Sequence, residues 1–251
     1  MFDAKKEKER IVKFIRDYFE ENHLGGAVIG ISGGKDSGVV AGLFTEALGK
    51  ENVLGVTLPC HSRSTDKSDA ELVSDYYGFE MVNIDLTEPY DSFKEQIKKL
   101  GDYTEEELKN SDINVKPRLR MTSLYYLAAL YSAIKGKTYV VAGTGNKCES
   151  YVGYFTKGGD GVSDINVLGD LTVEEVIKVG EQVNVPEKVL YKTPDDGLSG
   201  KSDEEKLGVK YSDIAKVINN EPLDEEIKEK IERLHKNNLH KFSTPIYKKE
   251  N

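Results

Sequence analysis

Six consecutive residues, Ser32 to Ser37, combine two glycines with a lysine, an aspartate and two serines. The apolar run 27–31 before them predicts a buried strand, and the run 38–44 after them predicts the start of a helix. A glycine-rich turn in this place directs backbone N–H groups and the positive end of the helix toward one point. The order therefore predicts an anion site that suits phosphate. The alternative is a glycine-rich turn without a ligand, as in many α/β proteins.

This turn differs from the P-loop pattern G-x-x-x-x-G-K-[ST]. Ile29 stands where the first glycine would be, and Asp36 stands where the magnesium-binding hydroxyl would be. The stretch instead resembles the SGGxDS signature of the N-type ATP pyrophosphatases, which cleave ATP between its α- and β-phosphates and use the AMP to activate an oxygen. The resemblance implies that the turn cradles the leaving pyrophosphate and that Asp36 binds Mg²⁺.

A second group of polar residues follows the apolar run 138–142, at 143–149 and again at 155–161. Parallel strands end at one edge of their sheet, and ligands of such folds bind at that edge. The two stretches hold glycines for close approach, lysines for phosphate and carboxylates for a metal ion. They are candidates for the same site as the turn at 32–37, or alternatively a flexible polar loop.

Strands and helices alternate along the chain and would position these turns. Apart from the run 27–31, we expect strands at 53–58, 81–86 and 138–142. We expect helices over the first twenty residues, 66–77, 117–134 and 173–183, and two further helices that start at 38 and at Thr87. Thr87 is expected to cap its helix, and capping boxes are expected at Thr104–Glu107 and Thr172–Glu175. The alternation predicts an α/β fold with a doubly wound, mostly parallel sheet and helices on both faces.

Length and composition narrow the class of protein. A chain of 251 residues suits one large α/β domain. The net charge of -9 argues against a general nucleic-acid binder, which needs a basic surface. The two cysteines, Cys60 and Cys148, suit a reducing cytoplasm without a disulfide. The sequence lacks a signal peptide pattern and an apolar run of membrane-spanning length, so we expect a cytoplasmic protein.

Four further stretches resemble the ammonia-dependent NAD synthetases, and the resemblance covers nearly the whole chain in the order of that family. These stretches are Arg118–Met121, Gly143–Glu149, Gly153–Gly161 and Asp203–Gly208. The resemblance implies an adenine nucleotide alpha hydrolase-like fold, one synthetase domain over 1–251 without a glutaminase domain, and a homodimer. It implies the final step of NAD biosynthesis, deamido-NAD⁺ + ATP + NH₃ → NAD⁺ + AMP + pyrophosphate, through an adenylated nicotinate carboxylate.

The resemblance also implies roles for individual residues. Asp36 and Glu149 correspond to Mg²⁺ ligands. We expect Lys35 and Asp36 to be the catalytic residues, because Lys35 and the Mg²⁺ held by Asp36 and Glu149 would stabilise the departing pyrophosphate. The implied ATP contacts are Gly30, Ile31, Ser32, Gly33, Gly34, Lys35, Asp36, Ser37, Thr144, Val173 and Asp195. The implied deamido-NAD⁺ contacts are Arg118, Lys157, Asp164, His240 and Lys241. Each of these five could instead be a solvated surface or turn residue. We expect Tyr125, Tyr126 and Tyr131 to pack within the fold rather than stack on a base.

Two positions depart from the family pattern. Val173 stands where a lysine is usual and Asp195 where a serine or threonine is usual, and both positions correspond to ATP contacts. Lys201 could supply the missing charge. Two alternative functions stay open: another pyrophosphatase-loop enzyme, such as a tRNA-thiolating or GMP-forming ligase, and a catalytically silent nucleotide-binding or regulatory subunit, which Val173 and Asp195 would favour.

Overall fold

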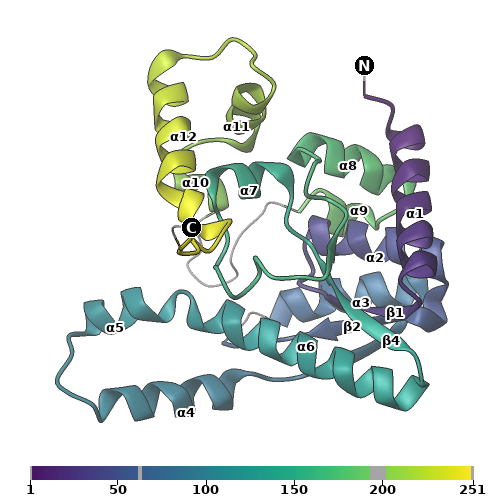
Figure 1. The fold of residues 1–251 in the computed structure, drawn as a ribbon, viewed down its shortest axis with the longest axis horizontal. Helices are drawn as coiled ribbons and strands as arrows, with labels where there is room; N and C mark the ends of the chain where they lie inside the picture. Colours follow the sequence, from purple (N-terminus) through teal and green to yellow (C-terminus); the bar gives the residue numbers. More distant parts are fainter. Residues whose placement is uncertain (1, 62–63, 193–201, 250–251) are drawn as a thin grey trace.

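The fold is built on a sheet of parallel strands, seen in a computed structural model that describes residues 2–61, 64–192 and 202–249 (Figure 1). The described strands run in the order β3-β2-β1-β4-β5 and every pair is parallel. Their bounds are Leu24–Gly30 for β1, Val53–Thr57 for β2, Glu80–Asn83 for β3, Thr138–Gly143 for β4 and Ile165–Asn166 for β5. This confirms the predicted doubly wound α/β sheet.

The strand order reverses between β1 and β4, which lie side by side in the middle of the sheet. Ile29 pairs with Gly55 of β2 on one side and with Ala142 of β4 on the other. Because all strands are parallel, the loops that follow β1 and β4 leave the sheet at the same edge. This reversal is the place where open α/β sheets bind ligands.

Helices cover both faces of the sheet (Figure 1). They are α1 Ala4–Glu21, α2 Lys35–Leu48, α3 Ser64–Tyr77, α4 Thr87–Lys98, α5 Glu105–Asp112, α6 Val115–Lys135, α7 Lys147–Val152, α8 Val173–Gln182, α9 Glu187–Leu190, α10 Asp203–Leu207, α11 Tyr211–Ile218 and α12 Glu225–Asn238, with 3-10 turns at Lys50–Asn52 and Leu239–Lys241. None of the described helices has both the length and the apolar composition needed to cross a membrane.

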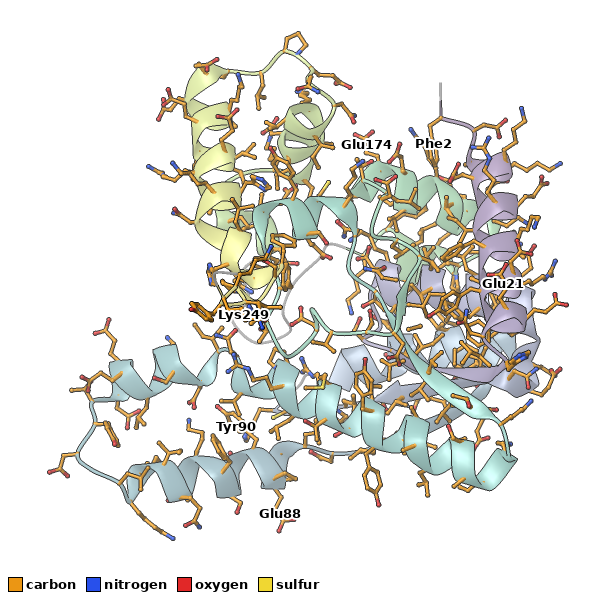
Figure 2. The ribbon with its side chains drawn as sticks, in the orientation of Figure 1. Phe2, Glu21, Glu88, Tyr90, Glu174 and Lys249 are labelled. Atoms are coloured by element: carbon orange, nitrogen blue, oxygen red, sulfur yellow. The ribbon has the colours of Figure 1, made fainter. Side chains whose placement is uncertain are left out.

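Alternate residues of β1 point to opposite faces, so each face has its own core. Ala27 and Ile29 pack with α1, α2, α3, α8 and α9, whereas Val28 packs with α4 and α6. Figure 2 shows Tyr90 on the side of α4 that faces α5 and α6, with Glu88 pointing away from them. Tyr90 belongs to the core beneath α6, and Glu88 is exposed.

A third, smaller core joins the helices that follow β4 in the chain. Cys148 and Val152 of α7 pack with Ile214 of α11 and Ile231 of α12. In Figure 1 these helices form a separate layer beyond the sheet edge. This layer stands beside the loops that carry the candidate site residues.

The predicted helix caps were right at two of three places. The capping boxes at Thr104–Glu107 and Thr172–Glu175 are both present. Thr87, however, does not cap α4; it is the first residue of the helix, and Leu86 is the cap. The side chain of Asp85 accepts the Thr87 N–H at 2.8 Å, so an aspartate two residues earlier fills the capping role.

Several element boundaries also differ from the prediction. β1 begins at Leu24 rather than Ala27, because α1 ends at Glu21 and His23 turns the chain with a φ of +55°. α2 begins at Lys35 rather than near Gly38. β3 ends at Asn83, although Ile84 N–H still donates to the Thr57 carbonyl at 3.0 Å.

Candidate active site

The turn after β1 is held by its own serines. Gly33 has a φ of +77°, a conformation that glycine adopts without strain. Ser32 Oγ accepts the Gly34 N–H at 3.2 Å and lies 3.1 Å from Ser37 Oγ, which donates to the Gly34 carbonyl at 3.0 Å. Gly34 is the N-cap of α2, and because it is a glycine, it has no side chain that could accept hydrogen bonds from the first N–H groups of that helix. The turn therefore presents a helix N-terminus that is shaped for an anion.

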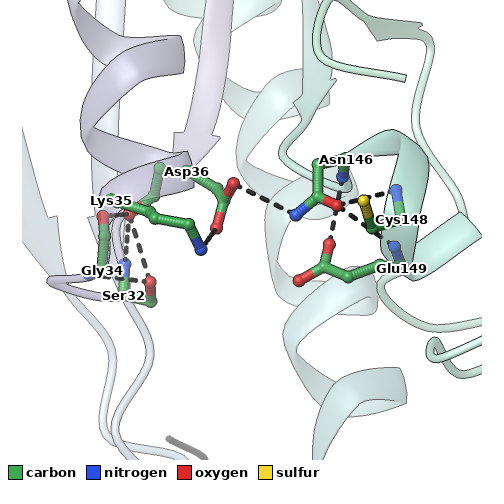
Figure 3. Close-up of polar contacts among 8 residues, drawn as sticks. Ser32, Gly34, Lys35, Asp36, Asn146, Cys148 and Glu149 are labelled. Atoms are coloured by element: carbon green, nitrogen blue, oxygen red, sulfur yellow. Dashed lines mark hydrogen bonds and ion pairs between the residues drawn. The ribbon is translucent and has the colours of Figure 1, made fainter. Parts of the chain in front are cut away.

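Lys35 is the first residue of α2 and is only 4% exposed. Its Nζ donates to Asp36 Oδ2 at 2.8 Å (Figure 3). The same Nζ lies 5.9 Å from the centroid of the Tyr211 ring. Burial lowers the pKa of the Lys35 ammonium, but Asp36, with Glu149 and Asp203 behind it, outweighs burial and leaves this pKa above its ordinary value. Lys35 is therefore a buried cation that is stabilised by the nearby carboxylates of Asp36, Glu149 and Asp203.

Asn146 connects the loop after β4 to this turn. Its side chain is fully buried, and its Nδ2 donates to Asp36 Oδ1 at 3.3 Å. Its Oδ1 accepts the N–H groups of Cys148 and Glu149 at 3.0 and 3.1 Å. Glu149 Oε2 accepts the Asn146 N–H in return at 3.0 Å, which completes a capping box at the start of α7.

The carboxylates of Asp36 and Glu149 face one another across Asn146 (Figure 3). Burial, and next the negative charge of Asp36, raises the pKa of the Glu149 carboxyl well above its ordinary value. A cation between the two would relieve this repulsion, and oxygen ligands suit Mg²⁺. Within residues 2–61, 64–192 and 202–249, no cluster of three or more His, Cys, Asp or Glu side chains could hold a metal ion by itself. A bound Mg²⁺ would therefore need further ligands from a substrate and water.

A pocket lies beside Lys35, between α8, α9 and α11. Its lining includes Lys35, Val173, Leu190, Lys192 and Tyr211. Val173 therefore lines the same pocket as Lys35. Thr144 follows β4 directly and is half-buried at the same sheet edge. Asp195 and Lys201 lie outside the described residues.

Four of the five residues implied in deamido-NAD⁺ binding come together. Arg118 of α6 donates through Nε and Nη2 to the Lys157 carbonyl at 3.4 and 3.3 Å. Lys157 Nζ donates to the carbonyls of His240 and Ser243 at 2.8 and 3.1 Å. Lys241 Nζ donates to two carbonyls of the loop after α7, those of Gly153 and Phe155, at 2.7 and 3.0 Å. Burial lowers the pKa of the Lys241 ammonium, and Asp160 acts in the opposite direction.

Asp164 has a different environment. Its Oδ2 accepts the Val141 N–H of β4 at 2.8 Å, and its Oδ1 accepts the Tyr125 hydroxyl at 3.2 Å. Burial and then Asp164 raise the pKa of Tyr125 to about 12. Asp164 therefore ties β4 to α6. Tyr125 and Tyr131 pack against the core as expected, but Tyr126 does not, because its side chain is 70% exposed.

Three residues of the site received no role from the sequence: Asn146, Asp203 and Tyr211. Asn146 and Glu149 have the spacing of a capping box, which could have identified the first of them. Asp203 accepts the Tyr154 hydroxyl at 3.0 Å and contributes to the field at Lys35. Asp203 and Tyr211 come from the helical layer, and no local pattern signals that they lie near Lys35 of α2.

Comparison with known proteins identifies the family and the fold. The sequence model of the family described as NAD synthase matches residues 7–249. A relative, the NH(3)-dependent NAD(+) synthetase of Carboxydothermus hydrogenoformans, is 36% identical, over 94% of this chain and 94% of that protein. The structure of an NMN synthetase from Francisella tularensis superposes with a TM-score of 0.88 and 30% identity, covering 99% of both chains. An NH3-dependent NAD synthetase from Campylobacter jejuni superposes with a TM-score of 0.76 and 28% identity, covering 99% and 100%.

Proposed function

The chain belongs to the NAD synthase family, and on that premise we propose that it is an ammonia-dependent NAD⁺ synthetase. It would be a ligase that forms a C–N bond, converting deamido-NAD⁺, ATP and ammonia to NAD⁺, AMP and pyrophosphate. The observation that carries the proposal is the junction of Lys35, Asp36, Asn146 and Glu149 at the point where the strand order reverses.

The chemistry explains why such a site is sufficient. A nicotinate carboxylate is a poor electrophile, so its oxygen first takes AMP from ATP as pyrophosphate leaves. Ammonia then attacks the carbonyl carbon, the C–O bond to AMP breaks and the amide forms. The protein has to align the reactants and neutralise charge on the phosphates. We assign the pyrophosphate to the N-terminus of α2 and to Lys35, which already lies there as a buried cation.

We assign Mg²⁺ to Asp36 and Glu149, whose opposed carboxylates fit a hard cation. Bound there, Mg²⁺ would supply positive charge to the phosphates of ATP. Asn146 holds both carboxylates in place, since it contacts each of them directly.

We assign ATP to the turn from Gly30 to Ser37 with Thr144, Val173 and Asp195, and deamido-NAD⁺ to Arg118, Lys157, Asp164, His240 and Lys241. In this structure Arg118 and Lys157 donate to main-chain carbonyls. Binding an anionic substrate would exchange those carbonyls for phosphate or carboxylate oxygens, which form stronger charge-assisted bonds. Asp164 supports this site through α6 and β4.

We further propose that residues 1–251 act as one synthetase domain without a glutaminase, in the cytoplasm and as a homodimer. The two free, buried cysteines suit a reducing compartment. Tyr126, Leu130 and Ile134 of α6 are 70, 42 and 63% exposed at i, i+4 and i+8, so they form an apolar stripe on one helix face. We assign the stripe to contact with a second copy of the chain.

The test is direct: purified protein is mixed with ATP, Mg²⁺, deamido-NAD⁺ and ammonium, and NAD⁺ and AMP are quantified. Equal amounts of the two products are expected. Nucleotide binding without product would instead favour the silent-subunit alternative.

A second candidate is amidation of nicotinate mononucleotide, which has the same carboxylate but lacks the AMP half of deamido-NAD⁺. It is favoured by the superposition on the Francisella tularensis NMN synthetase over 99% of both chains. Measuring kcat/KM for both substrates with one preparation separates the two, and the larger value identifies the substrate.

A further inference from the structure

Tyr211 carries a polar atom that the proposed chemistry has not used. It is the first residue of α11, and its side chain is 5% exposed. Its hydroxyl oxygen is buried and has no hydrogen-bond partner among the described residues. Buried hydroxyl groups are normally paired, because an unpaired one loses its bonds to water without replacement.

Three carboxylates act on this hydroxyl, those of Glu149, Asp203 and Asp36, and each of them accepts a hydrogen bond from another residue. Asp36 accepts from Lys35 and Asn146, and Glu149 accepts from the Asn146 N–H. Asp203 accepts the hydroxyl of Tyr154 at 3.0 Å, which makes Tyr154 a matched contrast to Tyr211. Burial, followed by Glu149, Asp203 and Asp36, raises the pKa of Tyr211, so its O–H stays protonated and able to donate.

The pocket beside Lys35 indicates what kind of ligand would accept a hydrogen bond from the Tyr211 hydroxyl. Tyr211 lines the pocket together with the ammonium-bearing side chains of Lys35 and Lys192. Lys192 Nζ lies 2.8 Å from Asp69 Oδ2, and Asp69 is 3% exposed, so this lysine is anchored in the fold. Glu204, an acid of the same pocket, is bound to the Tyr211 N–H at 2.8 Å. A ligand between two ammonium groups and a hydroxyl donor would be an anion with several oxygens.

We propose that Tyr211 is a further nucleotide-binding residue, whose hydroxyl donates to a phosphate oxygen of ATP and of the pyrophosphate product. The inference rests on the proposed function, because it takes its ligand from that reaction. The ring of Tyr211 lies beside Lys35, so the same side chain also limits where the Lys35 ammonium can move.

The test compares Tyr211→Phe with Tyr154→Phe in the full chain. Each removes one hydroxyl and keeps the ring. Calorimetry with Mg²⁺-pyrophosphate and with Mg²⁺-ATP gives affinity, and thermal unfolding without ligand gives stability. For Tyr211→Phe we expect an unchanged or higher Tm, a Kd for pyrophosphate about tenfold higher, and a KM raised for ATP but unchanged for deamido-NAD⁺. For Tyr154→Phe we expect a lower Tm, since its hydroxyl has a partner in the free protein.

The outcomes separate this inference from the proposed function. If the parent binds Mg²⁺-ATP and makes NAD⁺ while Tyr211→Phe has the parent's Kd values, the inference is wrong and the function stands. A lower Tm for Tyr211→Phe with unchanged affinity also overturns the inference, because the hydroxyl would then serve the fold. If the parent neither binds Mg²⁺-ATP nor makes product, both are wrong.

Discussion

Asn146 Nδ2 donates to Asp36 Oδ1 across 3.3 Å, although 110 residues separate the two in the chain. The same amide side chain caps α7 and so determines where Glu149 stands. Two carboxylates from different helices, Asp36 of α2 and Glu149 of α7, are thereby held by one buried residue, through its side chain and its backbone N–H respectively. Position and charge can be tested separately here, because Gln and Asn keep the shape of the acids and remove only their charge.

Asp36→Asn and Glu149→Gln should each lower turnover by about 100-fold or more, since an amide is a weak substitute for a charged ligand. Glu149→Gln should keep the Tm of the parent, because Gln still completes the capping box and repulsion from Asp36 disappears. Initial rates of NAD⁺ formation and thermal unfolding provide the measurements. Asp17→Asn, at an exposed ion pair on α1, is the control and should match the parent. Activity near that of the parent for Asp36→Asn at saturating Mg²⁺ would refute the metal assignment.

Arg118→Ala should raise the KM for deamido-NAD⁺ by about tenfold and leave the KM for ATP nearly unchanged, since one charge-assisted contact is lost. Arg118 is exposed, and its side chain donates to the Lys157 carbonyl on the surface, so the Tm should change little. Steady-state kinetics with each substrate varied in turn distinguishes the two KM values. An equal rise in both would place Arg118 outside the deamido-NAD⁺ site.

Glutamine should not replace ammonium as the nitrogen donor. A glutaminase with a cysteine nucleophile needs an accessible thiolate. The two cysteines of this chain, Cys60 and Cys148, are fully buried, and burial raises the pKa of Cys148 to about 11. NAD⁺ formation is measured with glutamine and with ammonium chloride at equal concentration. Comparable rates with glutamine would contradict the single-domain proposal.

Asp69→Asn should lower stability at pH 7 by about 1.5–3 kcal/mol, the scale of hydrogen bonds to charged groups. Asp69 lies 2.7 and 2.8 Å from the ammonium groups of Lys188 and Lys192. Burial alone would raise the pKa of Asp69, but the two lysines outweigh it and hold this pKa below the ordinary 3.8.

The sign of the pH dependence follows from that shift. The folded state binds the Asp69 proton less readily than the unfolded state, so the stabilisation is complete above pH 3.8 and is lost as the pH falls through the folded pKa. Urea unfolding of parent and variant between pH 7 and pH 3 should show their difference shrinking at the acid end. Asp75→Asn, on the exposed side of the same helix, is the control. A difference that is constant with pH would exclude a charge effect at Asp69.

Tyr126→Glu should convert a dimer to a monomer, because a charge at Tyr126, the most exposed residue of the stripe on α6, would be buried without a partner at the interface. Light scattering after size exclusion should give twice 28.0 kDa for the parent and 28.0 kDa for the variant. Phe14→Glu is the matched control, since Phe14 is 52% exposed on α1. If Phe14→Glu alone yields the monomer, the copies meet at α1 instead.

The sequence alone determined the local features of this protein. Its glycine-rich turn, strand and helix around Ser32–Ser37 and its capping boxes at Thr104 and Thr172 depend on residues a few positions apart. Hydrogen bonds and dihedral preferences over such distances are encoded where they occur. Alternation of apolar strands with helices likewise predicted the parallel sheet.

Tertiary structure alone decided which of these local features meet. The order β3-β2-β1-β4-β5 brings Asp36 to Asn146, and packing of α11 against α7 brings the Tyr211 ring to Lys35. Asp164 became a tie between β4 and α6, and Tyr126 was left exposed, because neighbours from distant segments determine what each side chain can reach. Contacts between residues about a hundred positions apart depend on strand order and helix packing, and short-range sequence patterns predict neither of them.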